Sequence, residues 1–468
     1  MDDNLKEAMV NDLLDVIDNK LLNEQTIGNF SHWYLQALLE ITRELENGRE
    51  FYTKIKSYIE QINIRRLMKK EKIVVGFIAN YSSTWIGDEL YKLLEASDRF
   101  EPYVFLIANQ NIEDIELIKK EYRENLNYFN KKGYRVKSTF NLETGRQYSW
   151  NEVGIMPEIC IWLTSWAELF KDQYYLLNYP LSVLHTYIPY GFMLAENKNK
   201  NFVFKQYDKT IHNIAWKNFW ESSFSLELSE KYSFVGKLNG VYTGVPKMDR
   251  LYNNETTNES VWDELLRKNN KLNSKKIIFA PHHSICDEGA VMFSTFQYNY
   301  RVMIDMAKKY EDETVWVFKP HPQLKYKAVK SGIFKDMDEW DKYINEWKSL
   351  KNATVIEEGD YCDLFKDSDA MILDSISFLA EYLYSHKPLL FLRKDGQYFN
   401  EFGEKLIEVH YGVNGNEEKL IEEFIMDIVI KENDYMKLER ERFFDQYLDY
   451  KKYNNKSAAE CIFSELLI

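Results

Sequence analysis

The feature that most constrains the fold is an alternation of short apolar runs with longer amphipathic stretches. Residues 73–79 form the first run, Ile-Val-Val-Gly-Phe-Ile-Ala, which contains no polar side chain. Such a run is typical of a strand buried on both faces of a sheet. Further runs lie at 103–107, 159–163 and 183–184, with predicted helices at 88–96 and 112–132. Strands that alternate with helices predict parallel β-α-β units.

A second series of apolar runs begins near Val241. Its predicted strands lie at 241–242, 277–280, 315–318, 354–356, 371–373 and 389–392. No sequence repeat of fixed period relates the two series, and 468 residues are too many for one compact core. We therefore predict an α/β protein with two doubly wound, Rossmann-like domains in tandem. In such folds, ligands bind in the crevice outside the carboxyl ends of the strands.

Both ends of the chain have a helical pattern. Before a charged break at 69–72, apolar residues recur at helical spacing. They are Met9, Leu13, Leu14, Ile17, Trp33, Leu35, Leu38, Leu39 and Ile41. This extension is interpreted as a helical subdomain or dimer contact, or alternatively as a segment that docks on a membrane or a partner. The last stretch, from about residue 417 to 468, is also helical and is charged.

The composition narrows the classes of function. The formal net charge of −14 argues against a broad nucleic-acid-binding surface, which needs clustered Lys and Arg. The four cysteines are far apart and form no Cys-x-x-Cys pair, so reduced thiols are expected rather than disulfides or a structural zinc site. The N-terminus is polar, unlike a signal peptide, and no run of about 18 apolar residues predicts a membrane span. These features favour a cytoplasmic protein.

Four of the eight histidines follow predicted strands, at the expected rim of the crevice. His185 is a candidate general base because imidazole titrates near neutrality; a loop histidine that bonds the backbone is the alternative. His282 and His283 follow the run 277–280. Adjacent side chains on an extended segment point to opposite sides, so we expect one to face a ligand and the other to pack. No third ligand is close in sequence, and no metal site is predicted.

Lys319 and His321 alternate with two prolines after the run 315–318. The prolines stiffen the loop and prevent an immediate helix. Both side chains can donate hydrogen bonds to phosphate oxygens. A rigid turn with solvated polar groups is the alternative.

Polar residues also close the run 371–373. Asp374, Ser375 and Ser377 either cap the helix that follows or cradle a phosphate at its N-terminus. Glu381, one turn further along, either accepts hydrogen bonds from a ribose diol or is a solvated helix residue.

A weaker signal comes from the segment around Gly244 and Lys247, where a strand is followed by a turn with glycine and proline. Its charged residues are positioned to reach the crevice. Neither Gly-x-Gly-x-x-Gly nor Gly-x-x-x-x-Gly-Lys-[Ser/Thr] occurs, so a Rossmann dehydrogenase or a P-loop protein would lack its phosphate loop.

Four ordered segments resemble the CDP-glycerol glycerophosphotransferase (teichoic acid polymerase-like) family. They are Thr-Gly-Val-Pro-Lys-Met-Asp at 243–249, Ala-Pro-His-His at 280–283, Lys-Pro-His-Pro at 319–322, and Asp-Tyr-Cys-Asp-Leu from 360, running to Asp-Ser-Ile-Ser ending at 377. The Lys-Pro that the family carries before its next strand is found here at 387–388.

The N-terminal half is similar more faintly. His185 looks like the counterpart of a histidine that the family carries in a His-Gly-Thr-Pro segment, its presumed base, although Thr-Tyr-Ile at 186–188 replaces the usual Gly-Thr. In the donor motif, Ile376 replaces the first serine of a pair and Ser375 stands where an aromatic residue is usual.

The resemblance implies a glycosyltransferase-B (GT-B) fold, in which the last helix crosses back to the N-terminal domain. We therefore expect a helical extension at 1–70, an acceptor domain at 71–236, a nucleotide-donor domain at 237–430 and C-terminal helices at 431–468. The resemblance also implies a CDP-alditol donor, a surface-glycan acceptor such as teichoic acid or capsule, and CMP as the leaving group. No cofactor is implied.

In the implied reaction, His185 takes a proton from an acceptor hydroxyl, and the oxygen attacks the distal phosphorus of the donor. His321, Lys319 and the helix start near Ser377 neutralise the phosphates, while Gly244, Lys247 and the other residues named above contact the donor. Two alternatives stay open: a sugar transferase or epimerase that uses a UDP-, GDP- or CMP-sugar, and a non-catalytic scaffold. Peripheral contact with the inner face of the membrane and self-association through the N-terminal helices are further expectations.

Overall fold

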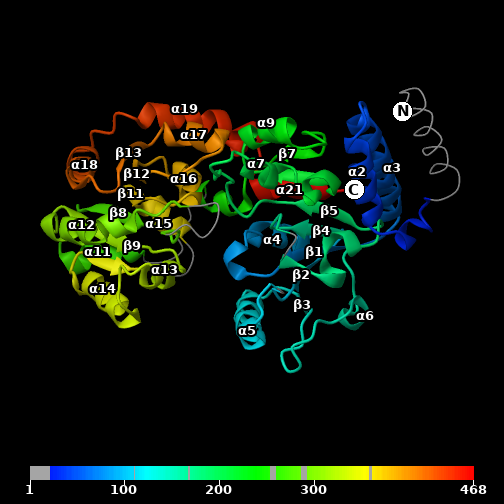
Figure 1. The fold of residues 1–468 in the computed structure, drawn as a ribbon, viewed down its shortest axis with the longest axis horizontal. Coiled ribbons are helices and arrows are strands. Elements are labelled where there is room, and N and C mark those ends of the chain that lie inside the picture. Colours follow the sequence, from blue (N-terminus) through cyan, green and yellow to red (C-terminus); the bar gives the residue numbers. More distant parts are fainter. Residues whose placement is uncertain (1–21, 110, 167–168, 253–259, 286–291, 358–360) are drawn as a thin grey trace. The chain divides into compact units, whose positions relative to one another are not determined.

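The computed structural model describes residues 22–109, 111–166, 169–252, 260–285, 292–357 and 361–468. The chain forms two compact units (Figure 1). Unit 1 comprises Met1–Gly191, Phe204–Lys247 and Tyr450–Ile468, and unit 2 comprises Phe192–Val203 and Met248–Asp449. Met9, Leu13, Leu14, Ile17, Cys286 and Asp360 lie outside the described residues.

Unit 1 is built on a parallel sheet of seven strands in the order β3-β2-β1-β4-β5-β6-β7. The strands are β1 (Ile73–Ala79), β2 (Phe100–Leu106), β3 (Val136–Ser138), β4 (Ile159–Trp162), β5 (Leu184–Tyr187), β6 (Lys217–Trp220) and β7 (Gly240–Tyr242). The central strand β1 pairs with β2 and β4, and its side chains are buried at six of seven positions. This burial on both faces is what its uninterrupted apolar run predicts.

The helices of unit 1 include those of the predicted N-terminal extension. They are α2 (Trp33–Arg43), α3 (Gly48–Met68), α4 (Asp88–Ala96), α5 (Ile115–Lys131), α6 (Trp150–Val153), α7 (Phe202–Tyr207), α8 (Thr210–Ile214), α9 (Ser223–Tyr232), α20 (Tyr450–Asn454) and α21 (Ala458–Leu466). The Tyr52 hydroxyl donates to the carbonyl of Asn213 (3.2 Å), and the Asn63 amide donates to the carbonyl of Leu181 (2.7 Å). Helix α3 is therefore an integral part of unit 1.

Unit 2 contains a parallel sheet of six strands in the order β10-β9-β8-β11-β12-β13. The strands are β8 (Lys275–Ala280), β9 (Thr314–Phe318), β10 (Ala353–Val355), β11 (Ala370–Leu373), β12 (Leu389–Arg393) and β13 (Tyr411–Asn414). Stacked rings fill one side of the core: the Phe279 and Phe318 centroids are 5.5 Å apart, and those of Phe318 and Trp347 are 5.3 Å apart.

The helices that cover this sheet are α10 (Asp249–Tyr252), α11 (Val261–Asn269), α12 (Phe296–Lys309), α13 (Leu324–Lys330), α14 (Met337–Ser349), α15 (Cys362–Asp367), α16 (Ser377–Glu381), α17 (Glu401–Ile407), α18 (Glu418–Glu423) and α19 (Lys437–Tyr447). A π-helix, Phe424–Ile430, continues α18.

Three chain segments are placed differently from the expectation. Strand β7 closes the edge of the first sheet, whereas Val241 was predicted to begin the second series. Helix α19 remains in unit 2, and only Tyr450–Ile468 returns to unit 1. The segment Phe192–Val203 joins unit 2, where Ala195 forms a β-bridge with Phe399. Apolar pattern alone does not say which sheet edge a three-residue strand joins.

The structure also bears on the cysteines and on membrane-spanning helices. Cys160, Cys362 and Cys461 are buried free thiols. Within the part of the chain that the structure describes, no helix is long and apolar enough to cross a bilayer.

Candidate functional site

Three imidazole rings gather at the carboxyl edge of the sheet in unit 2. Strands β8 and β9 are parallel neighbours, so the loops that follow them leave the same edge. The centroid of the His283 ring lies 4.2 Å from that of His282 and 4.2 Å from that of His321, and the His282 and His321 centroids are 5.5 Å apart. All three side chains are partly exposed. We call this set the imidazole cluster.

Backbone contacts bring the two loops together. The Lys319 amide donates to the carbonyl of Phe279 (2.8 Å), and the His321 amide donates to the carbonyl of Pro281 (3.2 Å). The expectation that His282 and His283 point to opposite sides is wrong, because the chain bends after Pro281 instead of staying extended. In this bend the amide of Ser284 donates to Nδ1 of His282 (3.3 Å).

Burial and neighbouring cations keep the cluster neutral. Burial, then His283 and Lys319, lower the pKa of His321 to about 3. Burial likewise lowers the pKa of His282 and of His283, with Lys394 contributing at His282 and Lys327 at His283. A site where several cationic groups crowd uncharged imidazoles is electrostatically suited to an anion, whose arrival would favour the protonated rings.

Asp374, at the end of β11, supports the cluster from beneath. It is fully buried; one carboxylate oxygen accepts from the His282 amide (2.5 Å), and the other accepts from the amide (2.5 Å) and hydroxyl (2.9 Å) of Thr295. Burial raises its pKa to about 6, against the effect of these hydrogen bonds. Its oxygens are thus engaged in holding the loop after β8 in place.

Of the two alternatives for Asp374, Ser375 and Ser377, capping of the next helix is wrong. The N-cap position of α16 is Ile376, and no side chain caps the helix. Ser377 is the first helical residue and is half-buried, while Ser375 is 9% exposed. The hydroxyl of Ser377 is therefore not needed to cap the helix.

Lys319 and Glu381 are both buried and both interact with Tyr361. The ammonium of Lys319 lies 5.7 Å from the ring centroid of Tyr361, whose hydroxyl donates to Glu381 (2.5 Å). Lys319 is 7% exposed and Glu381 is 4% exposed. The alternative of a solvated helix residue is therefore wrong for Glu381. Tyr361 belongs to the Asp-Tyr-Cys-Asp-Leu segment named above, but nothing in the sequence indicated its contacts with Lys319 and Glu381.

His185 lies inside strand β5 and not in the loop after it, so its predicted position at the strand end is wrong. The residue is 1% exposed. Its Nδ1 accepts from the indole N–H of Trp162 (2.9 Å), and its ring centroid is 4.3 Å from that of His32. Burial, and then His32, hold the pKa of His185 well below its usual value. The strand is longer than its apolar run because Thr186 and Tyr187 also pair with β4.

Gly244 has a structural reason to be glycine. Its φ of +79° lies in the left-handed region, and an added Cβ would come within 2.0 Å of the Tyr450 ring. Gly244 and Lys247 are in unit 1, whereas the imidazole cluster, Lys319, Asp374, Ser375, Ser377 and Glu381 are in unit 2. Among the described residues, no group of three or more His, Cys, Asp or Glu side chains has an arrangement that could hold a metal ion.

Solved structures with the same fold define the class of protein. UDP-GlcNAc 2-epimerase from Neisseria meningitidis, bound to UDP-GlcNAc, superposes with a TM-score of 0.52 at 15% identity, covering 85% of this chain and 99% of that one. The wall teichoic acid polymerase TagF superposes with a TM-score of 0.51 at 13% identity, covering 89% and 98%. The predicted fold class, α/β of the GT-B type with two Rossmann-like sheets, is confirmed.

The family follows from the sequence itself. Residues 193–467, more than half of the chain, match the model of the family described as CDP-Glycerol:Poly(glycerophosphate) glycerophosphotransferase. The protein belongs to this family and is a transferase, as its motifs suggested. No curated protein matches the sequence significantly.

Proposed function

We propose that the protein transfers an alditol phosphate, glycerol phosphate in the first instance, from a CDP-activated donor to a surface-glycan acceptor. The observation that carries the proposal is the imidazole cluster with Lys319, Lys327 and Lys394 around it, at the strand ends of unit 2. A diphosphate needs several hydrogen-bond donors and cations in one place, and this edge supplies both. Unit 2 is thus the donor unit and unit 1 the acceptor unit.

In the reaction, an acceptor hydroxyl oxygen forms a bond to the distal phosphorus of the donor. The bond between that phosphorus and the bridging oxygen breaks, CMP leaves, and the hydroxyl proton passes to a base. Positioning and charge neutralisation supply most of the rate in such transfers. His321, His282 and Lys319 are assigned to the phosphate oxygens, and Ser375, Ser377 and Glu381 to the remainder of the donor.

The base is assigned to the imidazole cluster instead of His185. A general base must come within hydrogen-bond distance of the hydroxyl, and His185 is 1% exposed with one ring nitrogen already bonded. In the cluster, His282 bonds the hydroxyl of Ser284 (2.7 Å), and Nδ1 of His321 accepts from the Gln323 amide (3.1 Å). Within the cluster the base is assigned to His283, because its side chain is partly exposed and its ring lies between those of His282 and His321.

The test is CMP release from CDP-glycerol with poly(glycerol phosphate) or fragments of the host surface glycan as acceptor. We expect CMP release by the wild type and a loss of about 10²-fold or more in His321→Ala. His386→Asn is a matched control, because His386 is also in unit 2 but exposed, and Asn tolerates its left-handed φ of 58°. Preferential binding of UDP- or GDP-sugars over CDP-glycerol, or no nucleotide binding at all, would contradict the proposal.

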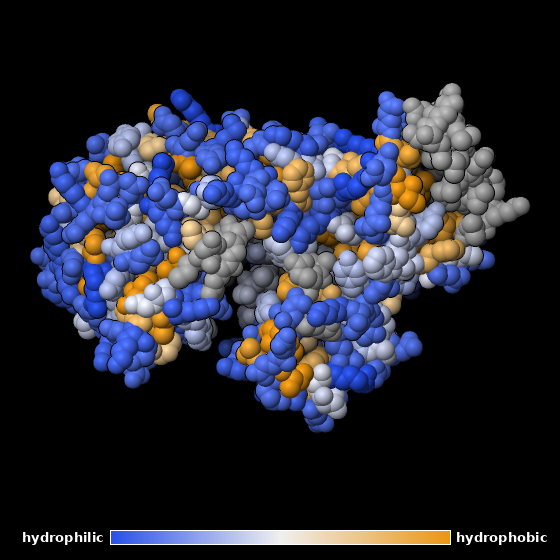
Figure 2. Space-filling model, viewed as in Figure 1, coloured by the Kyte–Doolittle hydropathy of each residue, from blue (hydrophilic) through white to orange (hydrophobic). Residues whose placement is uncertain are grey.

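Two finer proposals concern location and association. We infer peripheral contact with the inner face of the cell membrane, where a lipid-linked acceptor would be met, and self-association through the N-terminal helices. Their support is the hydrophobic surface that Figure 2 shows over α2 and α3, together with the exposure of Trp33 (50%), Ile41 (63%) and Met68 (62%) on these two helices. Sedimentation with anionic vesicles tests the first, and the mass from light scattering tests the second.

A further inference from the structure

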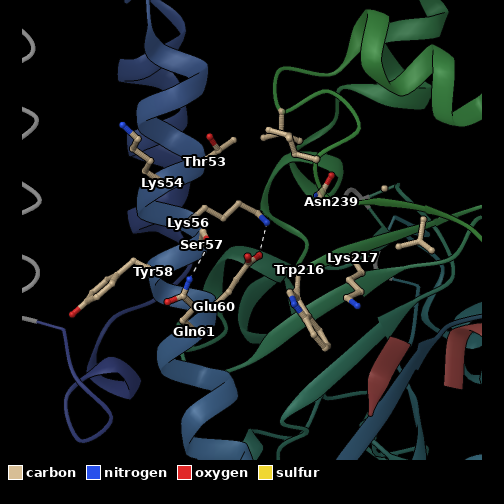
Figure 3. A pocket seen from close by; sticks show the side chains of 14 residues that line it. Thr53, Lys54, Lys56, Ser57, Tyr58, Glu60, Gln61, Trp216, Lys217 and Asn239 are labelled. Atoms are coloured by element: carbon tan, nitrogen blue, oxygen red, sulfur yellow. Dashed lines mark hydrogen bonds and ion pairs between the residues drawn. The ribbon is translucent and has the colours of Figure 1, made fainter. Parts of the chain in front are cut away.

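A cavity of about 740 Å³ opens in unit 1 at the edge of the sheet opposite to the strand carboxyl ends (Figure 3). It lies between α3, the first residues of β6 and β7, and the loop 235–239. Its volume is in the range of small-molecule sites. Because β6 and β7 begin at this cavity, it is separate from the carboxyl edge of the same sheet, where the reaction of a GT-B protein is expected.

The wall that α3 contributes is polar and charged. Lys56 and Glu60, one turn apart, form an ion pair that lies against the cavity, and their side chains are 6% and 18% exposed. Taking two charges out of water costs free energy that their attraction does not fully recover, so packing alone does not favour such a pair. Ser57 and Gln61 lie beside the pair and add a hydroxyl and an amide. This wall can donate and accept hydrogen bonds at several points.

The facing wall combines an aromatic ring with a cation. The half-buried Trp216 indole lines the cavity, and the ammonium of Lys217 lies 4.9 Å from its ring centroid. Asn239, 8% exposed, lies at this wall, and its amide nitrogen donates to the carbonyls of His212 (2.9 Å) and Ala215 (2.8 Å). An indole face accommodates the C–H surface of a polyol or sugar, while amides and hydroxyls bond its oxygens.

The charged groups of the lining are balanced. Each lysine that lines the cavity is paired with a carboxylate: Lys54 with Glu50, Lys56 with Glu60, and Lys217 with Glu465. A lining of paired charges, hydroxyl and amide groups and an indole suits a polyol or sugar, which is neutral and has many hydroxyl groups.

We propose that this cavity binds a polyol or sugar segment of the acceptor chain, away from its reacting end. The inference rests on the proposed function for the identity of the acceptor. Strand β6 has four residues and so spans about 13 Å. A polymeric acceptor of a few repeat units is long enough to contact both the cavity and the carboxyl edge of this sheet. The site would then select for long acceptors over short ones.

The experiment measures binding of a long and a short glycerol phosphate oligomer to the full chain by calorimetry, without donor. Trp216→Ala removes the aromatic face, and Ser57→Trp fills the cavity from an exposed position of α3 where no core contact is lost. We expect each variant to weaken binding of the long oligomer about tenfold and to leave the affinity for CDP unchanged. Phe204→Ala, at an aromatic residue of unit 1 that is 49% exposed and outside the cavity, is the control.

The possible outcomes separate this inference from the proposed function. Unchanged affinity for the long oligomer in both Trp216→Ala and Ser57→Trp would overturn the inference, even if the wild type releases CMP from CDP-glycerol. Tenfold weaker binding confined to these two variants supports it. A wild type that turns over no CDP-alditol would overturn the proposed function, while the oligomer titration would still test the cavity.

Discussion

Both units contain closely packed imidazoles, but His32 and His185 of unit 1 are buried, whereas the cluster in unit 2 is partly exposed. In unit 1, the ring centroids of His32 and His185 are 4.3 Å apart, and the residues are 3% and 1% exposed. Each has a partner in the protein: Nδ1 of His32 bonds the carbonyl of Tyr179 (3.0 Å), and Nδ1 of His185 accepts from Trp162 (2.9 Å). In unit 2, three rings at similar distances are partly exposed, and Nδ1 of His283 is unpaired among the described residues.

The comparison teaches that proximity of histidines is a poor sign of function by itself. The useful sign is exposure at the carboxyl edge of a parallel sheet, because an unpaired ring nitrogen occurs among the described residues of both sets, at Nε2 of His185 and at Nδ1 of His283. Both sets have lowered pKa values, and burial is the largest cause in each. In unit 1 the buried histidines are part of the packed core. In unit 2 the histidines lie at the carboxyl edge of the sheet, where Lys319, Lys327 and Lys394 also lower their pKa values.

The largest effect is expected from His283→Ala, which tests whether the exposed histidines of unit 2 take part in the reaction. If His283 is the base, the rate of CMP release should fall by about 10²- to 10⁴-fold at saturating donor, with little change in the affinity for CDP. Turnover should be followed as a function of pH, because loss of a base also removes the acidic limb of the profile. Wild-type turnover in this variant would show that His283 is not the base.

A second prediction concerns stability in acid, to which the buried histidines of unit 1 contribute. The pKa of His32 is lowered to about 4 and that of His212 to about 3, whereas both should titrate near 6.5 when unfolded. The unfolded state therefore binds protons first, and stability is lost as pH falls through 6.5 toward 4. For His32 alone the loss is about 3 kcal/mol.

Urea midpoints measured between pH 7 and pH 4 check this effect. His32→Gln should flatten the dependence, and a midpoint independent of pH would show that these imidazoles can be protonated without unfolding.

Third, His185→Gln should lower the stability of the protein and leave its turnover nearly unchanged. Glutamine keeps an acceptor for the Trp162 N–H but not the ring packing, so we expect a loss of roughly 1–3 kcal/mol in the free energy of unfolding. The turnover of the folded fraction should stay within about threefold of the wild type, because rate losses typical of a missing base are far larger. A selective loss of turnover with unchanged thermal stability would instead support His185 as the base.

The smallest effect is expected in the pH dependence of donor binding. The cluster is neutral in the free protein and faces Lys319, Lys327 and Lys394, with Asp374 beneath. A bound diphosphate raises the pKa of the rings, so binding takes up protons, and the affinity for CDP should rise about three- to tenfold from pH 8 to pH 6. Calorimetry in buffers of different ionisation enthalpy measures the uptake, and His321→Ala should reduce it.

Much of the fold was predictable because local pattern carries it. Continuous apolar runs such as 73–79 and 315–318 identify central strands, and the motifs after them mark the correct edge of the sheet in unit 2. Three short strands were not predicted: β3 and β13 at sheet edges, and β6 next to an edge, have three or four residues and mixed polarity. The cavity beside α3 also had no sequence signal, because its walls come from 53–61, 216–217 and 235–241.

The sequence by itself determined the α/β class, the family and the residue types at the strand ends of unit 2. Only the tertiary structure decided that His185 is buried beside His32, that His282 and His283 share one side with His321, and that β7 joins the first sheet. The physical reason is that periodicity and propensity are local, whereas burial and hydrogen-bond partners depend on residues far apart in the chain. For His185 those partners are 23 and 153 residues away.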